Sequence, residues 1–515
     1  MIQRRTFLKN ASLMAAAAAA PRALAHCGSC EPKPAKKPNI LFVLVDDWGW
    51  KDASCYGSEF YETPNLDKFA KEAVRFTDGY AGHPVCSPTR AAIMTGNNPV
   101  RKEINLPDWI GARRDPRAKI LVPPNEDQLA LAQVTVAEAL KAAGYSTWFC
   151  GKWHLGDKGF FPEDQGFDVN HGGHHKGSPP GGYYSPYNNP KLPSGPKGEY
   201  LPDRLTDETI KLIKAQPKDK PFLAYHSFYT VHTPIQAFKR HIKKFEAKRT
   251  KYIAELTAKN GGKAPAKTKR EIFGTTRVVQ DNAAFASMVY AMDENLGRLF
   301  KALKDAGQYD NTIIYITGDN GTLATTGRNS GGPSSAYPLR AGKGWCFEGG
   351  IRVPVIIRDP RAKANGTVCE VPVYAEDYYP TIMAQAGLKN PKGQCLDGVS
   401  LAGLLDGKKA LDRTEPMVWH YPRYHGSLHV PSSAIREGDW KLVDNYHLGK
   451  QFLFNLKDDI GETKNLAKTN PKKAAELHKT LHDYLKKIGA GMPTKNPDFK
   501  PGADTKKPKK DKKKK

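Results

Sequence analysis

Ile40-Leu41-Phe42-Val43-Leu44-Val45 is a short, uninterrupted apolar run, and Asp46 and Asp47 follow it directly. A run of this length is typical of a parallel strand that is buried on both faces of a sheet. In an open α/β sheet, functional residues gather outside the carboxyl ends of such strands. The two carboxylates therefore indicate either an oxygen-ligand site for a hard cation such as Ca²⁺ or Mg²⁺, or an ordinary solvated turn.

A second run of the same kind, residues 312–317, ends in Asp319 and Asn320. If both runs are parallel strands of one sheet, four oxygen-bearing side chains meet at one edge, which is a more specific prediction than either pair alone. Up to about residue 390, expected helices alternate with expected strands along the chain, which predicts an α/β fold with a large, mixed, mostly parallel sheet flanked by helices. The expected helices are 134–143, 203–215, 283–303 and 378–386, and the other expected strands are 147–150, 222–225 and 355–357.

After about residue 410 the pattern changes to short alternating segments followed by an amphipathic helix at 473–488. This pattern predicts a smaller C-terminal domain with an antiparallel sheet and a helix. The expected organisation is a leader at 1–25, a linker at 26–37, a main domain at 38–410, the smaller domain at 411–490, and a disordered lysine-rich tail at 491–515.

The first 25 residues have the pattern of an export signal. Arg4-Arg5 precedes an apolar stretch at 13–20, and Ala23-Leu24-Ala25 fits a cleavage site after Ala25. We expect export by the twin-arginine machinery to the periplasm or the medium, with a Sec signal as the alternative. No internal apolar run is long enough to cross a membrane, so the mature protein has no predicted transmembrane segment. Cys27 and Cys30 are close enough to form a pair, in a Pro/Lys-rich stretch.

The chain of 515 residues carries a formal net charge of +26, part of it in the leader and in the terminal lysine run. A basic protein attracts polyanions. The sequence has no zinc-finger, helix-turn-helix or RNA-binding pattern, so nucleic acid is not the expected partner. For an exported protein, a sulfated polysaccharide or an acidic surface fits better.

Cys86-Ser87-Pro88-Thr89-Arg90 precedes an apolar Ala-Ala-Ile-Met segment. Pro88 suits the first turn of a helix, and a helix N-terminus favours negative charge. Arg90 adds a fork of donors suited to an oxyanion. The stretch therefore indicates a nucleophile facing an anionic group, or alternatively a helix-capping loop with a buried thiol.

Ionisable residues also follow other expected strands. Lys152 and His154 come after 147–150, and two residues spaced in this way on an extended segment face the same side. His232 precedes Thr233-Pro234 after the strand at 222–225. The Gly-, Pro- and aromatic-rich loop at 157–200 is a candidate substrate rim, or a plain surface loop. Its candidate contact residues are His171, His174, His175, Tyr183 and Tyr184.

Cys86-x-Pro88-x-Arg90 with Thr95-Gly96 resembles the signal of the type I, formylglycine-dependent sulfatases. The resemblance, to arylsulfatase-A-like bacterial members of the alkaline-phosphatase-like superfamily, covers roughly residues 38–470 and includes several separated motifs in family order. They are Asp46-Asp47-Trp48-Gly49, Thr63-Pro64-Asn65-Leu66-Asp67, the Cys86 motif, Lys152 with His154, His232, Asp319-Asn320 and Lys343.

The resemblance implies that a maturation enzyme converts Cys86 to formylglycine. It also implies a Ca²⁺ site, with Mg²⁺ as the alternative ion. Its ligands would be Asp46, Asp47, residue 86, Asp319 and Asn320. Arg90, Lys152 and Lys343 would offset charge on the sulfate and on the hydrated aldehyde, His154 would act on the hydrate, and His232 would protonate the leaving alcohol. The expected activity is sulfate ester hydrolysis on a sulfated carbohydrate.

Two other functions remain open from the sequence. Phosphonate and phosphate ester hydrolases of the same superfamily share the Cys-x-Pro-x-Arg motif. An exported polyanion-binding protein with an inactive site would show the same charge. Turnover of matched sulfate and phosphate esters distinguishes a sulfatase from a phosphonate or phosphate ester hydrolase. The chemical state of Cys86 distinguishes a sulfatase from a polyanion-binding protein.

Overall fold

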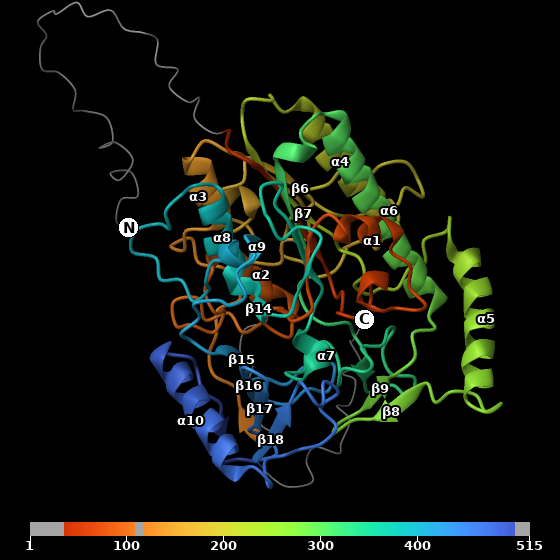
Figure 1. Ribbon diagram of the computed structural model, residues 1–515, viewed down its shortest axis with the longest axis vertical. Coiled ribbons are helices and arrows are strands. Elements are labelled where there is room, and N and C mark those ends of the chain that lie inside the picture. The colour runs from red at the N-terminus through yellow and green to blue at the C-terminus, as the bar shows by residue number, and fades with distance from the viewer. Residues whose placement is uncertain (1–35, 109–117, 500–515) are drawn as a thin grey trace, which may run out of the picture. The chain divides into compact units, whose positions relative to one another are not determined.

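The computed structural model describes residues 36–108 and 118–499 (Figure 1). The predicted leader, Cys27, Cys30 and the terminal lysine run lie outside the described residues. The chain divides into two compact units, residues 1–36 and 37–515, and the second contains every helix and strand given below.

An eight-stranded sheet forms the centre of the protein, in the order β13-β2-β12-β10-β1-β7-β5-β6. Strand β1 lies between β10 and β7 and is parallel to both, and β5 continues the parallel part, whereas β12 runs antiparallel to β10 and β2. The predicted mixed, mostly parallel sheet is confirmed. The strands are β1 (Asn39–Val45), β2 (Val74–Phe76), β5 (Ser146–Gly151), β6 (Val169–His171), β7 (Phe222–Ser227), β10 (Thr312–Gly318), β12 (Val355–Arg358) and β13 (Val368–Cys369).

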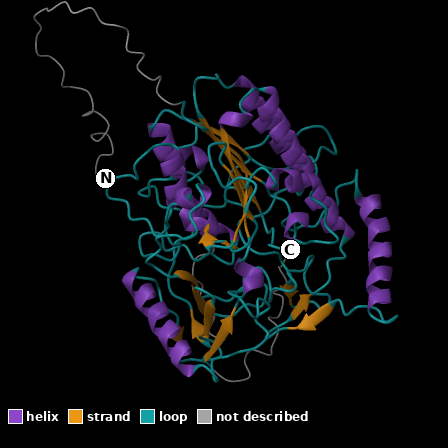
Figure 2. Cartoon of the chain, in the orientation of Figure 1, coloured by secondary structure: helices purple, strands orange, loops and turns teal. Residues whose placement is uncertain are grey.

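Helices cover both faces of this sheet, which explains the continuous apolar sequence of β1 (Figure 2). Leu41, Val43 and Val45 pack in one core with residues of α1, α4 and α6, while Ile40, Phe42 and Leu44 pack in another with α2, α3 and α8. These helices are α1 (Pro64–Ala70), α2 (Cys86–Thr95), α3 (Val136–Ala142), α4 (Leu201–Ala215), α6 (Ala283–Asp305) and α8 (Tyr378–Gln385).

The smaller predicted sheet is also present, with strands β15 (Met417–Tyr421), β16 (Ser432–Glu437), β17 (Trp440–Asn445) and β18 (Lys450–Asn455). All neighbouring strands are antiparallel. One face packs against α10 (Pro471–Lys487), and the other packs on residues of the main body such as Trp345 and Phe347. The alternating segments at 433–436, 440–443 and 451–454 correspond to β16, β17 and β18, and β15 precedes them as a strand that the pattern did not indicate.

The ordered chain extends beyond residue 490, where the disordered tail was expected to begin. Strand β19 (Thr494–Lys495) pairs with β4 (Ile120–Leu121), and the Asn496 backbone donates to Lys119 O at 3.0 Å. Backbone pairing therefore ties residues 494–496 to residues 119–121.

The lysine-rich region at 239–270 contains a single long helix, α5 (Ile242–Lys259). Within the described residues, no helix is both long enough and apolar enough to cross a membrane. The remaining elements are short. They are β3 (Gly79–Tyr80), β8 (Thr268–Arg270), β9 (Thr275–Arg277), β11 (Thr325–Thr326), β14 (Val373–Tyr374), α7 (Glu348–Ile351), α9 (Ala402–Leu405) and the 3₁₀ turns Ser54–Tyr56, Pro162–Gln165, Tyr309–Asn311 and Ala375–Asp377.

Candidate active site

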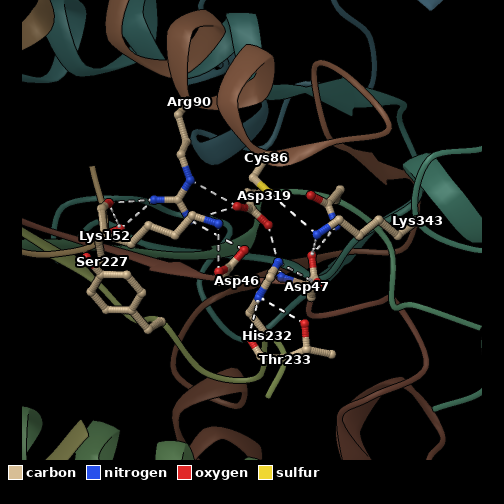
Figure 3. Close-up of polar contacts among 12 residues, drawn as sticks. Asp46, Asp47, Cys86, Arg90, Lys152, Ser227, His232, Thr233, Asp319 and Lys343 are labelled. Atoms are coloured by element: carbon tan, nitrogen blue, oxygen red, sulfur yellow. Dashed lines mark hydrogen bonds and ion pairs between the residues drawn. The ribbon is translucent and has the colours of Figure 1, made fainter. Parts of the chain in front are cut away.

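The carboxyl ends of the parallel strands bring the predicted polar residues together (Figure 3). Asp46 and Asp47 follow β1, and Asp319 and Asn320 follow its neighbour β10. The Asp47 backbone N–H donates to Asp319 Oδ1 at 3.0 Å, and Asn320 Nδ2 donates to Asp47 Oδ1 at 2.9 Å. The four oxygen-bearing side chains predicted from the two apolar runs thus form one cluster.

Cys86 is the first residue of α2 and is 5% exposed. Burial raises the pKa of its thiol to about 11, although Lys152 and Lys343 oppose this shift. Lys343 Nζ lies 3.6 Å from Cys86 Sγ. The thiol is therefore protonated at neutral pH, so the encoded side chain is a poor nucleophile even at a helix N-terminus.

Arg90, one turn further along α2, binds protein groups rather than an open space. Its Nε and Nη2 donate to Asp319 Oδ2 at 3.0 and 2.7 Å, and its Nη1 donates to Lys152 O and Ser227 Oγ, both at 2.7 Å. The guanidinium thus forms a fork that ties the helix to three strand ends, and its contact with an oxyanion stays a prediction. Ser227, at the end of β7, was missed; a polar residue ending an apolar strand was its only signal.

Two buried lysines complete the charge of the cluster. Lys152 Nζ donates to Asp46 Oδ2 at 2.7 Å, and Lys343 Nζ lies 2.6 Å from Asp47 Oδ1. Burial alone would raise the pKa of Asp47, but Lys343 and His232 hold it well below its usual value. Burial raises the pKa of Asp46 well above its usual value, against the effect of Lys152.

His232 lies beside the carboxylates. Its Nε2 is 3.7 Å from Asp47 Oδ2, and its Nδ1 lies 2.7 Å from Thr233 O, so a hydrogen on Nδ1 would be donated to that carbonyl. Burial, together with Lys343, lowers the pKa of His232 to about 3. The resting imidazole is therefore neutral.

His154 is 4% exposed, and burial, followed by Lys152, lowers its pKa well below the usual value. The segment is not extended as expected, because β5 ends at Gly151 and His154 has a φ of +62°. A Cβ at Gly177 would lie 2.4 Å from the imidazole, so the loop packs closely on this ring. His154 joins the site through a turn rather than along a strand.

The cluster fits a hard divalent cation. One potential ligand atom from each of Asp46, Asp47, Cys86 and His232 lies within 4.8 Å of the other three. Among the described residues, the buried Asp46 Oδ1 and Asn320 Oδ1 accept no hydrogen bond. Buried carboxylate and amide oxygens without a hydrogen-bond partner are suited to bind Ca²⁺ or Mg²⁺.

The five predicted rim residues differ in exposure. Tyr183 is fully buried, and its hydroxyl donates to Tyr229 O at 2.5 Å and to His232 O at 2.8 Å, so it supports the His232 loop instead of forming an exposed rim. His174 is 1% exposed. His171 and Tyr184 are half-buried, and the side chain of His175 is 38% exposed. Tyr183 and His174 are thus buried, whereas His171, His175 and Tyr184 keep exposed surface.

The chain is similar to known proteins over most of its length. Residues 38–388 match the family model described as Sulfatase, and residues 341–490 match the one described as N-sulphoglucosamine sulphohydrolase, C-terminal. Human arylsulfatase A is 31% identical over 448 residues, covering 82% of this chain and 78% of that protein. Human N-acetylgalactosamine-6-sulfatase is 30% identical over 405 residues, covering 74% and 68%. The solved structure of Ps i-CgsB in complex with k-i-k-neocarrahexaose is similar with a TM-score of 0.69 and 28% identity, covering 90% of this chain and 95% of that one.

Proposed function

This chain belongs to the sulfatase family and is a sulfatase, and we propose that it removes sulfate from a sulfated carbohydrate through a formylglycine made from Cys86, with Ca²⁺ bound. The observation that carries the proposal is the buried cluster around Cys86. It combines Lys343 at 3.6 Å, the carboxylates of Asp46 and Asp47, and two neutral histidines. A protonated thiol in such a setting is a poor catalyst, whereas a hydrated aldehyde at the same position has the hydroxyl groups that the reaction needs.

The proposed reaction has two steps. One hydroxyl of the hydrated residue 86 gives its proton to a carboxylate of the cluster and attacks sulfur. The bond from sulfur to the carbohydrate oxygen breaks as that oxygen takes a proton from the protonated form of His232. His154 then removes the proton of the second hydroxyl. The bond between the residue 86 carbon and the sulfate oxygen breaks, so sulfate leaves and the aldehyde forms again. Lys152 and Lys343 offset the negative charge on the sulfate oxygens.

The pKa values of the two histidines agree with these roles. Burial and Lys152 keep His154 neutral, as a base must be before it accepts a proton. His232 is neutral in the resting protein, and the negative charge of a bound sulfate ester would raise its pKa. A divalent cation held by Asp46, Asp47, Asp319 and Asn320 would supply positive charge that favours the ionised hydroxyl.

A carbohydrate substrate is supported by the net charge of +26 and by two similar proteins, one named N-acetylgalactosamine-6-sulfatase and one solved with k-i-k-neocarrahexaose. We propose export by the twin-arginine route to the periplasm or the medium. This proposal rests on the leader predicted at 1–25 and on the need for a maturation enzyme.

The test combines mass spectrometry of the Cys86 peptide with sulfate release from a panel of sulfated oligosaccharides. We expect the aldehyde at position 86, repeated turnover by the wild type, and no multiple turnover by Cys86→Ser, because serine offers no second hydroxyl to expel sulfate. Full steady-state activity of Cys86→Ser would refute the mechanism. Faster turnover of a matched phosphate ester than of the sulfate ester would refute the substrate class.

A further inference from the structure

A second cluster of potential metal ligands lies between α10 and β17. His478 and His482 are four residues apart on α10, so both side chains lie on one face of the helix. Asp444 comes from β17 opposite this face. His482 Nε2 is 2.9 Å and His478 Nε2 is 3.3 Å from the same oxygen, Asp444 Oδ2. The potential ligand atoms of all three residues lie within 4.8 Å of one another.

These distances match the spacing of ligands around a small metal ion. Zinc binds imidazole nitrogen and carboxylate oxygen at about 2.0–2.2 Å in tetrahedral geometry, which places neighbouring ligand atoms about 3.3 Å apart. The two Nε2···Oδ2 distances are close to that edge length. Both histidines also turn the same ring nitrogen towards the same carboxylate oxygen, so the three atoms already converge on one point.

The surroundings allow an ion to enter. The side chains of His478 and His482 are 38% and 33% exposed, while that of Asp444 is 12% exposed. The imidazoles lie with ring centroids 4.3 Å apart, and the ring of Tyr446 lies 6.3 Å from that of His482. Solvent can therefore supply a fourth ligand, while β17 holds the carboxylate in place.

No residue of α10 or β17 is among those placed in the candidate active site. Figure 1 shows α10 along the side of the sheet formed by β15 to β18. Leu477, Leu481 and Leu485 of α10 pack on that sheet through apolar contacts. An ion at the cluster would add a polar cross-link between the same two elements.

We propose that Asp444, His478 and His482 bind one divalent transition-metal ion, with Zn²⁺ the best match to a donor set of two imidazoles and one carboxylate, and that the ion fastens α10 to β17. The site is independent of the hydrolysis proposed above. Without an ion, the two imidazoles serve only as hydrogen-bond partners of Asp444.

The test uses the full chain after chelation and dialysis into saturating Ca²⁺, followed by calorimetric titration with Zn²⁺. The main variant is His478→Gln/His482→Gln, because glutamine favours a helix and can still donate to Asp444 but is a poor zinc ligand. Lys479→Gln is the matched control, since its side chain is 79% exposed on the same helix. Asp444→Asn is a second variant that removes the charged ligand with little change in shape.

We expect the wild type and Lys479→Gln to bind one more Zn²⁺ per chain than the double variant. Loss of outer-shell partners alone costs about 10–100-fold in affinity, so loss of two direct ligands should weaken binding by more than about 100-fold. Zn²⁺ should also slow hydrogen exchange in α10 of the wild type but not of the double variant, while sulfate release stays unchanged. Equal Zn²⁺ stoichiometry in the wild type, the double variant and Asp444→Asn, or equal protection of α10, would overturn the proposal.

Discussion

Replacing Lys441 with methionine tests how the smaller sheet supports the segment that carries Lys343. Lys441 Nζ lies 2.8 Å from Glu348 Oε1 and 2.9 Å from Glu462 Oε1, and the side chains of all three residues are fully buried. Glu348 begins α7, five residues after Lys343, and its backbone N–H donates to Glu462 Oε2 at 2.7 Å. The ammonium group thus joins β17 to the main body.

Removing one charge from a buried network leaves its partners uncompensated, which costs about 3–5 kcal/mol. Glu348 keeps Arg352, whose Nε lies 2.7 Å from Glu348 Oε2. Burial raises the pKa of Glu462, and Lys441 is the main group that opposes this. In Lys441→Met, Glu462 therefore takes up a proton when the chain folds.

The sign of the pH dependence follows from this proton. A carboxyl whose pKa is raised in the folded state destabilises the protein once the pH exceeds its unfolded value. The penalty grows with pH up to the folded pKa, by at most about 1.4 kcal/mol per unit. The loss caused by Lys441→Met should therefore be larger at pH 8 than at pH 5.

Urea unfolding followed by tryptophan fluorescence measures this loss at both pH values. The control is Lys441→Met/Glu462→Gln, which removes the unpaired carboxylate and should recover more than half of the stability lost at pH 8. A loss below about 1 kcal/mol at pH 8, the size expected of an exposed ion pair, would refute the reasoning. So would an equal loss at pH 5 and pH 8.

Three other substitutions test the site and its support. Lys343→Ala should lower kcat/KM for sulfate release by about 10²–10³-fold, because a buried donor beside Cys86 and Asp47 is lost; a loss below tenfold would contradict its role. Gly151→Ala should destabilise the protein by about 3 kcal/mol in urea unfolding, because Gly151 has a φ of +121° and its Cβ would lie 1.7 Å from Ser227 O; wild-type stability would contradict this placement. Glu376→Gln should stabilise the protein at pH 8. The gain is about 1.4 kcal/mol for each pH unit, above the ordinary pKa, over which the folded carboxyl keeps its proton. Burial raises that pKa, and neither carboxyl oxygen has a hydrogen-bond partner among the described residues. The same unfolding measurement at pH 4 should show almost no difference, and an equal effect at both pH values would contradict it.

The central sheet could be predicted because its strands are buried on both faces. Such strands have no polar face, so β1 and β10 stand out as continuous apolar runs in the sequence. Their direction is parallel, so the polar residues that follow them had to meet at one edge. Strand β15 was missed although its five residues are all buried. It carries a histidine and two aromatic residues, and no clear turn precedes it.

The buried charges could not be predicted from the sequence in the same way. Lys441 lies in an alternating strand, where a lysine normally faces solvent. It shares a face with Val443, and this face packs on the main body while the other packs on α10. The burial of Lys441 thus depends on a second layer that local sequence does not specify. Ser227 was missed for a related reason, because its partner is distant in the chain. Tyr183 was expected at the substrate rim, and its buried contact with Tyr229 O is also distant in the chain.

The position of Arg90 follows from the sequence, whereas its contacts are seen only in the structure. The sequence places it one turn after Cys86, and in the structure it donates four hydrogen bonds, to Asp319, Ser227 and the Lys152 carbonyl. The start of α2 is thereby fixed to the ends of β10, β7 and β5 together. Cys86 owes its position to this anchoring, whereas its thiol has a pKa of about 11 because it is buried. The fold therefore positions residue 86 accurately but leaves the encoded thiol unreactive, which is the combination expected if the side chain acts only after its oxidation.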